Sequence, residues 1–199
     1  MDEYQLSEGL GEFRKRIDGF SVGYHVVAVA GGSASGKGYI LDHFLTLPGI
    51  ARVAIDNYYL SGSGGSGVCT NHDEPRALDL KLLMEHLLAL KDGKGVDVPI
   101  YNFINGMREG SYRQEPCRII ILDGLFAFYD QGFQDVADLK VYVEASDEVR
   151  LSRRLKRDVE ERGRTEEGVL IKWERTVLPM HNLYVSPQKE LADLVIVNN

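Results

Sequence analysis

Residues 31–38, Gly-Gly-Ser-Ala-Ser-Gly-Lys-Gly, decide how this sequence folds. The apolar run 25–30 (His-Val-Val-Ala-Val-Ala) before them predicts a buried strand, and residues 39–47 after them carry apolar side chains at helical spacing. A strand, a glycine-rich turn and a helix form the setting of a phosphate-binding loop, or P-loop. In such a turn, successive backbone N–H groups point at one anion, and the helix adds its positive dipole end. The stretch therefore predicts phosphate binding.

One position of this loop departs from the motif. The motif G-x-x-x-x-G-K continues with Ser or Thr, whose hydroxyl binds Mg²⁺, but this sequence has Gly38. Metal handling, and with it catalytic strength, is therefore open, and the alternative interpretation is a glycine turn with a solvated lysine. The residues predicted to bind the phosphates are Gly31, Gly32, Ser33, Ala34, Ser35, Gly36, Lys37 and Gly38.

Length and composition limit the class of protein. The 199 residues, with 44% hydrophobic and 27% charged, fit one globular domain over residues 1–199. The N-terminus lacks a signal-peptide layout, no apolar run approaches the ~20 residues of a membrane span, and Cys69 and Cys117 are isolated. We therefore expect a cytoplasmic protein with no membrane contact. The net charge of −7 argues against nucleic acid as a partner, and a homo-oligomer is open.

Two predicted strands end in carboxylates. Residues 52–55 lead to Asp56, and the apolar run 118–122 leads to Asp123. Parallel α/β sheets bind ligands at the carboxyl ends of their strands. An acid after an apolar strand is also the Walker B layout, in which the carboxylate holds Mg²⁺ directly or through water. We predict Asp123 as the acid on the metal side and Asp56 as the acid that accepts a hydroxyl proton.

An arginine cluster contrasts with the acidic background. Ser146 is expected to cap a helix from Asp147, in which Leu151, Leu155 and Val159 share one face and the arginines occupy the opposite arc. A solvated basic face is one interpretation. The other is a group that closes over a triphosphate and neutralises charge during transfer. The arginines of this region are Arg150, Arg153, Arg154, Arg157, Arg162 and Arg164.

The other segments predict strands alternating with helices, and so a parallel sheet covered on both faces. Residues 96–114 predict a projecting β-hairpin, and the glycine- and serine-rich residues 61–67 predict a surface loop or a gate over the site. Further expected elements are a helical extension over 1–23, a helix over 79–90 with Asp79 as its N-cap, a strand over 139–143, a helix over 166–178 that stops at Pro179, and a strand over 193–197.

Several segments resemble those of uridine–cytidine kinases in order and spacing. They are residues 27–37, 56–59 (Asp-Asn-Tyr-Tyr), 72–75 (His-Asp-Glu-Pro), 99–103, 122–129, 150–158, 161–164 (Glu-Arg-Gly-Arg) and 192–196. Across residues 25–197 the chain is similar to the uridine kinase and phosphoribulokinase superfamily. The resemblance implies a three-layer α/β fold of the P-loop nucleoside triphosphate hydrolase type, with a parallel five-stranded sheet and a β-hairpin lid over the acceptor site. It also implies ATP and Mg²⁺ as cofactors and a small-molecule acceptor.

The same resemblance implies roles for individual residues. Asp56 would be the general base for the 5′-hydroxyl of a nucleoside. The implied catalytic residues are Asp56, Lys37, Asp123 and Arg157, and the metal ligands are Asp56 and Asp123. Arg154, Arg157 and Arg162 would join the loop in binding the nucleotide. The implied acceptor-binding residues are Asp56, Tyr58, Asp73, Tyr101, Phe103, Arg108, Arg164 and Lys172.

Two acceptor-side positions depart from the family pattern. The pyrimidine-reading histidine would fall at Gly106, and a nucleoside-binding glutamine would fall at Lys172. A pocket without base-reading hydrogen bonds discriminates less, and Lys172 with Arg164 would suit an anionic acceptor. Three functions therefore stay open: a nucleoside kinase, a kinase for a phosphorylated sugar or other anionic metabolite, and a catalytically weak nucleotide-binding regulatory protein. The choice between ATP and GTP is open as well.

Overall fold

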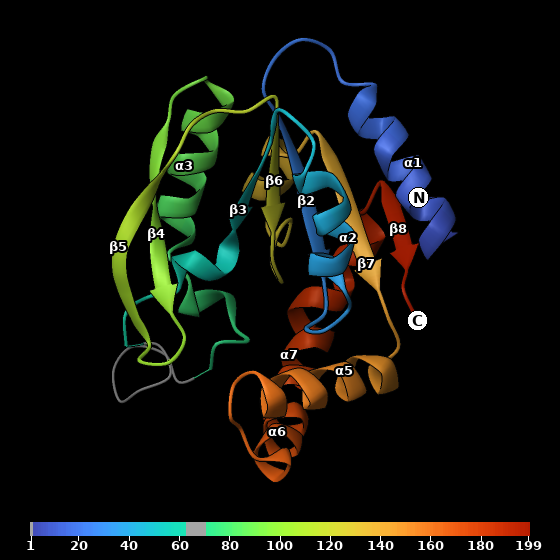
Figure 1. Ribbon diagram of the computed structural model, residues 1–199, viewed down its shortest axis with the longest axis vertical. Coiled ribbons are helices and arrows are strands. Elements are labelled where there is room, and N and C mark those ends of the chain that lie inside the picture. Colours follow the sequence, from blue (N-terminus) through green and yellow to red (C-terminus); the bar gives the residue numbers. More distant parts are fainter. Residues whose placement is uncertain (1, 63–70) are drawn as a thin grey trace.

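The computed structural model describes residues 2–62 and 71–199, and its centre is a parallel sheet of six strands in the order β1-β8-β7-β2-β6-β3 (Figure 1). The three-layer α/β architecture is as predicted, with one strand more than expected. Within the described residues no helix is both long and apolar enough to cross a membrane. The strands are β1 (Asp2–Gln5), β2 (His25–Gly31), β3 (Ile50–Ala54), β6 (Ile119–Asp123), β7 (Leu139–Glu144) and β8 (Leu194–Val197).

The extra strand lies at the N-terminus, where a purely helical extension was predicted. β1 pairs in parallel with β8, Tyr4 opposite Ile196, and α1 (Leu6–Asp18) follows it directly. β1 has the sequence Asp-Glu-Tyr-Gln and is largely exposed. An edge strand needs only backbone pairing on one side, so it can form without an apolar pattern. The sequence pattern therefore gave no sign of it.

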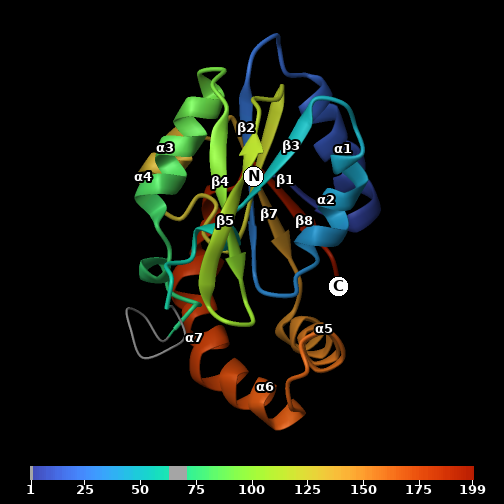
Figure 2. The same ribbon diagram turned by 60° about the vertical axis from the view of Figure 1, so that its left-hand side comes forward.

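Two apolar layers hold the sheet between helices (Figures 1 and 2). On one face, α1 and α2 (Lys37–Leu45) bury Phe13, Ile40 and Phe44 against side chains of the central strands. On the other face lie α3 (Leu80–Lys91) and α4 (Gln131–Val136), with Leu83 and Phe133 fully buried. The Asp79 carboxylate caps α3 by accepting from the Leu82 N–H at 3.1 Å, as predicted.

The predicted hairpin is present as β4 (Val96–Asn102) and β5 (Met107–Gln114), which pair antiparallel. It forms a separate two-stranded sheet on the side of α3 (Figure 1). Two short 3₁₀ helices, η1 (Ile55–Tyr58) and η2 (Pro75–Ala77), lie near its turn. Most of the predicted glycine- and serine-rich loop, from residue 63 on, falls outside the described residues.

The helical part below the sheet continues further than predicted. After α5 (Asp147–Glu160) and α6 (Glu166–Lys172), helical structure does not end at Pro179. It passes through π-helical η3 (Trp173–Val177), α7 (Leu178–Met180), π-helical η4 (His181–Val185) and 3₁₀ η5 (Ser186–Leu191). Pro179 stands in the first turn of α7, where its missing N–H is tolerated. The π-helical η3 and η4 lie on either side of α7, and their i to i+5 hydrogen bonds replace the ordinary α-helical pattern next to the proline.

Candidate active site

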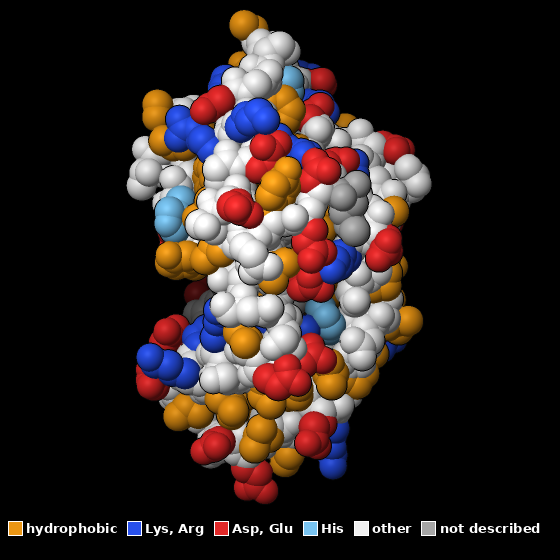
Figure 3. All heavy atoms as spheres, turned by 90° about the vertical axis from the view of Figure 1, so that its right-hand side faces the viewer, with side chains coloured by type: hydrophobic (Ala, Val, Ile, Leu, Met, Phe, Trp, Pro, Cys, Tyr) orange, Lys and Arg blue, Asp and Glu red, His pale blue; other side chains and the backbone are white. Residues whose placement is uncertain are grey.

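A cavity of about 390 Å³ opens between the carboxyl edge of the sheet and the helical part that contains α5 and α6. Figure 3 shows the molecule hollowed between these two parts, with Lys and Arg side chains beside the hollow. Its size is that of a small-molecule site. The lining residues are Ser33, Ala34, Gly36, Lys37, Gly38, Arg52, Ala54, Asp56, Tyr59, His72, Asp73, Phe103, Asp123, Gly124, Leu125, Arg154, Arg157, Arg162, Arg164 and Lys172.

The glycine-rich loop has the backbone conformation that its glycines predict. Gly31 has φ 150° and Gly36 has φ 95°, and a Cβ at Gly31 would overlap the carbonyl oxygen of Val143. The Lys37 ammonium donates to the carbonyl oxygens of Gly31 and Gly32, at 2.8 and 3.1 Å. The loop thus curls around the lysine, and Lys37 lines the cavity together with Ser33 and Gly36.

Buried arginines of α5 brace this loop from behind. Arg150 Nε donates to the Ser33 carbonyl oxygen at 3.3 Å, and Arg154 Nη1 donates to Ser33 Oγ at 2.6 Å. The Arg150 guanidinium also lies 5.0 Å from the ring centroid of Trp173. Only 1% of Arg150 is exposed, whereas Val159 is 40% exposed. Of the two interpretations of this helix, the solvated basic face is wrong, because the arginine face is the one that packs inward.

Asp158 anchors the arginines that reach the cavity. It is fully buried and pairs with Arg157 at 2.9 Å, with Arg162 at 3.2 Å and with Arg154 at 3.5 Å. Burial alone would raise the pKa of the Asp158 carboxyl, but the three guanidinium groups outweigh it and hold that pKa below its ordinary value. One carboxylate therefore keeps three cations in place over the cavity.

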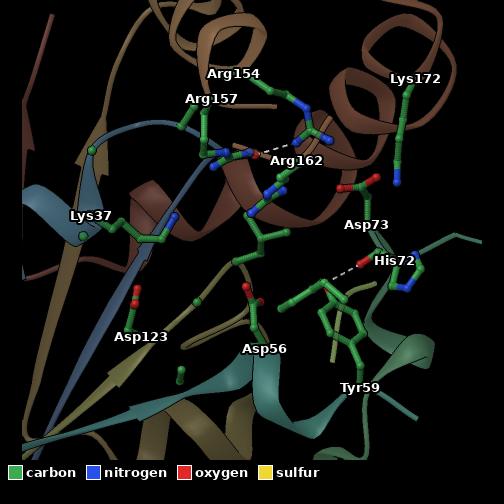
Figure 4. A pocket seen from close by; sticks show the side chains of 18 of the residues that line it. Lys37, Asp56, Tyr59, His72, Asp73, Asp123, Arg154, Arg157, Arg162 and Lys172 are labelled. Atoms are coloured by element: carbon green, nitrogen blue, oxygen red, sulfur yellow. Dashed lines mark hydrogen bonds between the residues drawn. The ribbon is translucent and has the colours of Figure 1, made fainter. Parts of the chain in front are cut away.

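Two carboxylates face these cations from the sheet, as Figure 4 shows. Asp123 ends β6, and Asp56 lies in η1 just beyond β3. Asp56 is open to the cavity, yet the surrounding protein and the neighbouring Asp123 raise the pKa of its carboxyl, against the pull of Lys37. Burial likewise lowers the pKa of Lys37, and Asp123 and Asp56 oppose that shift.

The far end of the cavity has aromatic and polar walls. Tyr59 packs edge-to-face on Phe103, with ring centroids 5.9 Å apart, and its hydroxyl donates to the His72 carbonyl oxygen at 2.8 Å. Asp73 is 8% exposed and accepts from Thr176 Oγ1 at 3.2 Å. Lys172 reaches toward Asp73 from the opposite side (Figure 4), and burial lowers the pKa of its ammonium while Asp73 opposes that shift.

Three predicted acceptor-binding residues do not belong to the described lining of this cavity. Tyr58 is fully buried, and its hydroxyl bonds with His86 Nδ1 at 2.9 Å. Arg108 donates to the carbonyl oxygens of Tyr58 and Tyr59 at 2.7 and 2.9 Å, which ties the hairpin to η1. Tyr101 packs behind Phe103 with ring centroids 5.0 Å apart. These side chains support the wall.

Of the predicted residues, Asp56, Asp73, Phe103, Arg164 and Lys172 do meet in the cavity, as do Lys37, Asp123, Arg154, Arg157 and Arg162. The lining of the cavity also includes Arg52, Tyr59 and His72, which are not among the predicted site residues. Tyr59 and His72 stand inside segments that carry the family resemblance, so that signal was available. Arg52 lies within a predicted strand and gave no signal.

The residues on the metal side fit Mg²⁺. The Oδ1 atom of Asp123 is buried and has no hydrogen-bond partner among the described residues, so a carboxylate lone pair is free. Mg²⁺ prefers oxygen ligands and is commonly held by one or two carboxylates together with substrate phosphates. In the described part of the chain, no group of three acidic, His or Cys side chains could hold a metal alone. Bound phosphate oxygens would have to complete such a site.

Comparison with known proteins identifies the family. The model of the phosphoribulokinase / uridine kinase family matches residues 26–198. A uridine kinase of Lactococcus lactis is 36% identical over 178 residues, which are 86% of this chain and 86% of that one. A uridine kinase of Macrococcus caseolyticus is 38% identical with the same coverage of both chains. The chain belongs to the phosphoribulokinase / uridine kinase family, and it is an ATP-dependent kinase.

Solved structures show the same fold at lower identity. A candidate fructose transport system kinase from Silicibacter sp. TM1040 superposes with a TM-score of 0.74 at 20% identity, covering 96% of this chain and 98% of that one. A possible uridine kinase from Bacillus stearothermophilus gives 0.70 at 14% identity, with the same coverage. These similarities support the P-loop kinase fold of the protein.

Proposed function

We propose that the protein transfers the terminal phosphoryl group of ATP to the 5′-hydroxyl of a nucleoside such as uridine or cytidine. The observation that carries the proposal is the position of Asp56 in the cavity, between Lys37 and Asp123 on one side and Tyr59 on the other (Figure 4). The similarity to uridine kinases supports the nucleoside as acceptor. This arrangement suits a hydroxyl that is deprotonated next to bound phosphates.

In the proposed mechanism, Asp56 acts as the general base. Its ionised carboxylate accepts the proton of the acceptor hydroxyl as that oxygen forms a bond to the terminal phosphorus, and the bond from phosphorus to the bridging oxygen of the leaving diphosphate breaks. The raised pKa of Asp56 makes it a stronger base than an ordinary aspartate. Because the ionised form is needed, activity should fall as the pH drops through that raised pKa.

Positive charge for the transferred group would come from Lys37, Arg154, Arg157 and Arg162. The carbonyl oxygens of Gly31 and Gly32 hold Lys37, and Asp158 holds the three arginines, so little reorganisation is needed during transfer. Asp123, with Asp56, would hold Mg²⁺ through carboxylate oxygens. When bound, Mg²⁺ neutralises charge on the phosphates and orients them.

Asp73 and the aromatic wall would bind the acceptor. Asp73 is held by Thr176 and can accept hydrogen bonds from ribose hydroxyls, while the exposed part of Phe103 offers a stacking surface for a base.

A second candidate function is a kinase for an anionic acceptor such as a sugar phosphate. The observation that favours it is Lys172, which lines this end of the cavity together with Arg164.

The test is phosphoryl transfer from ATP with Mg²⁺, screened against uridine, cytidine, other nucleosides and a panel of sugar phosphates. Product with a pyrimidine nucleoside supports the first function. Product only with an anionic acceptor rejects it in favour of the second. Absence of product with every acceptor, while ATP still binds, would contradict both.

A further inference from the structure

Arg52 is the cation of the cavity that no part of the proposed mechanism uses. It lies in β3, and its side chain reaches the cavity with 40% of its surface exposed. Its Nη2 donates to Oδ2 of Asp123, the carboxylate predicted to hold Mg²⁺, in a short contact. Arg52 thus already occupies one oxygen of the acid on the metal side.

The structure leaves room where the motif normally has a hydroxyl. No heavy atom of the described chain outside the immediate neighbourhood of Gly38 lies within 4 Å of the point where a Cβ would stand. A serine side chain would therefore fit, and its absence is not forced by packing. Relative to the motif, the P-loop therefore lacks one metal ligand, and no other described side chain takes the place of that ligand.

The cations on this side of the cavity outnumber the carboxylates without a metal. Lys37 and Arg52 face Asp56 and Asp123, and Arg162 also acts on Asp56. Among these cations, Arg52 is the one bonded to Asp123, so it supplies positive charge at the carboxylate predicted to hold Mg²⁺. A guanidinium group also presents several N–H donors in a planar fork that matches phosphate oxygens.

We propose that Arg52 binds the phosphates of the donor nucleotide and supplies positive charge on the metal side of the loop, where Gly38 cannot bind Mg²⁺. The nucleotide then binds with little dependence on Mg²⁺. The guanidinium exchanges its Asp123 partner for phosphate oxygens when the nucleotide enters. This inference rests on the donor half of the proposed function and needs no acceptor, so its failure can be told apart from a failure of nucleoside phosphorylation.

The experiment measures the dissociation constant of a non-hydrolysable ATP analogue by calorimetry, with Mg²⁺ and with EDTA. For the unaltered protein we expect the two constants to agree within about threefold. Arg52→Met should weaken binding in EDTA by about tenfold or more, the value of a lost charge-assisted hydrogen bond. The loss should be smaller with Mg²⁺, because the metal then supplies the missing charge. Arg52→Lys should recover part of the affinity in EDTA.

Two further variants give the experiment its controls. Arg14→Met removes an arginine that also pairs with an aspartate, Asp18 at 2.7 Å, but lies on α1 away from the cavity, and it should leave both constants unchanged. Gly38→Ser in the Arg52→Met background should restore tight binding with Mg²⁺ only. Thermal unfolding shows whether each variant is folded.

Two results would overturn the inference. One is a dissociation constant of the unaltered protein that rises more than about tenfold in EDTA, with the same ratio in Arg52→Met. The other is a loss in Arg52→Met that is equal with and without Mg²⁺, since this would mean that Arg52 only supports the shape of the site.

Discussion

The two ends of the cavity are built in opposite ways. The wall that faces the phosphates consists of the P-loop and α5, where Arg150 and Arg154 are 1% and 5% exposed and donate to Ser33. The acceptor wall includes the tip of the β4–β5 hairpin, where Phe103 is 49% and the next residue, Ile104, 97% exposed. The phosphate wall is fixed by buried arginines, whereas the acceptor wall combines the buried Tyr59 and Asp73 with an exposed hairpin tip.

The difference follows from what each wall has to recognise. A triphosphate is the same in every donor, so its binding groups can be fixed by buried hydrogen bonds that tolerate little change. An acceptor differs between members of one fold, and an exposed hairpin tip can change without unfolding the protein. Of the three departures that the resemblance implies, Lys172 lines the far end of the cavity, Gly106 lies in the turn of the hairpin, and Gly38 belongs to the P-loop.

The largest expected effect comes from Asp56, which stands between the two walls. Asp56→Asn should lower the rate of transfer by about 10²–10⁴-fold, because the amide cannot accept the hydroxyl proton. Nucleotide affinity should change by less than about threefold, since Lys37 and the arginines remain. Steady-state kinetics and calorimetry measure the two quantities. Asp92→Asn, at a 69% exposed side chain after α3, is the matched control. Turnover at the unaltered rate in Asp56→Asn would reject the base.

Lys172→Gln tests whether the acceptor wall sets the substrate. Removing the ammonium should shift the ratio of kcat/KM for uridine over that for an anionic acceptor by about tenfold toward uridine, because a half-buried positive charge that would pair with an anionic acceptor is lost. Competition between the two acceptors in one reaction measures the ratio directly. Lys156→Gln removes an exposed lysine of α5 and should leave the ratio as it is. A ratio that does not move in Lys172→Gln would mean that this side chain does not touch the acceptor.

Phe103→Ala tests how the two walls meet. The Arg162 guanidinium lies 5.9 Å from the Phe103 ring centroid, so the ring contacts both the acceptor space and the arginine cluster. Loss of stacking and of this cation–π contact should raise the KM for the acceptor by about three- to tenfold. Ile104→Ala is the neighbouring control, because that side chain is 97% exposed. Equal changes of this KM in Phe103→Ala and Ile104→Ala would show that the Phe103 ring makes no specific contact with the acceptor.

The last expected effect concerns the free energy of unfolding, not the reaction. Burial, Arg150 and Lys37 lower the pKa of the His181 imidazole to about 3. Between roughly pH 6.5 and pH 3 the unfolded chain therefore binds a proton at this position that the native protein does not, and the free energy of unfolding falls as the pH drops. His181→Gln should remove this contribution and lose fewer degrees of Tm between pH 7 and pH 4. An equal loss of Tm in the unaltered protein and in His181→Gln would contradict this role of His181.

The parts of the fold predicted from sequence are those set by local patterns. Apolar runs that end in Gly31 and Asp123 gave the central strands β2 and β6, and alternation gave the hairpin. Because strand ends meet at one sheet edge, the sequence pattern alone places the carboxylates at 56 and 123 with the P-loop. Each of these features depends on a few residues that are neighbours in the sequence.

What could not be predicted depends on contacts between distant segments. Arg150 is buried because the Ser33 carbonyl and the Trp173 ring receive its guanidinium, and helical periodicity alone assigns such a residue to solvent. Tyr58 and Arg108 lie in segments next to the site, but their side chains satisfy His86 and backbone carbonyls instead. The π-helical turns around Pro179 have no pattern that marks them in the sequence.

The pairing of β1 with β8 has a consequence for synthesis on the ribosome. The sheet cannot be completed at this edge until residues 194–197 have emerged, because they are the partners of residues 2–5. At ~5–20 residues per second, the first helix waits about 10–40 s for that strand. During this time Phe13 and Ile17 of α1 lack Leu194 and Ile196, two of the side chains that cover them in the finished protein. In nascent chains of this kinase, part of the apolar face of α1 therefore stays uncovered until β8 has been made, although Phe44 can already pack on Phe13.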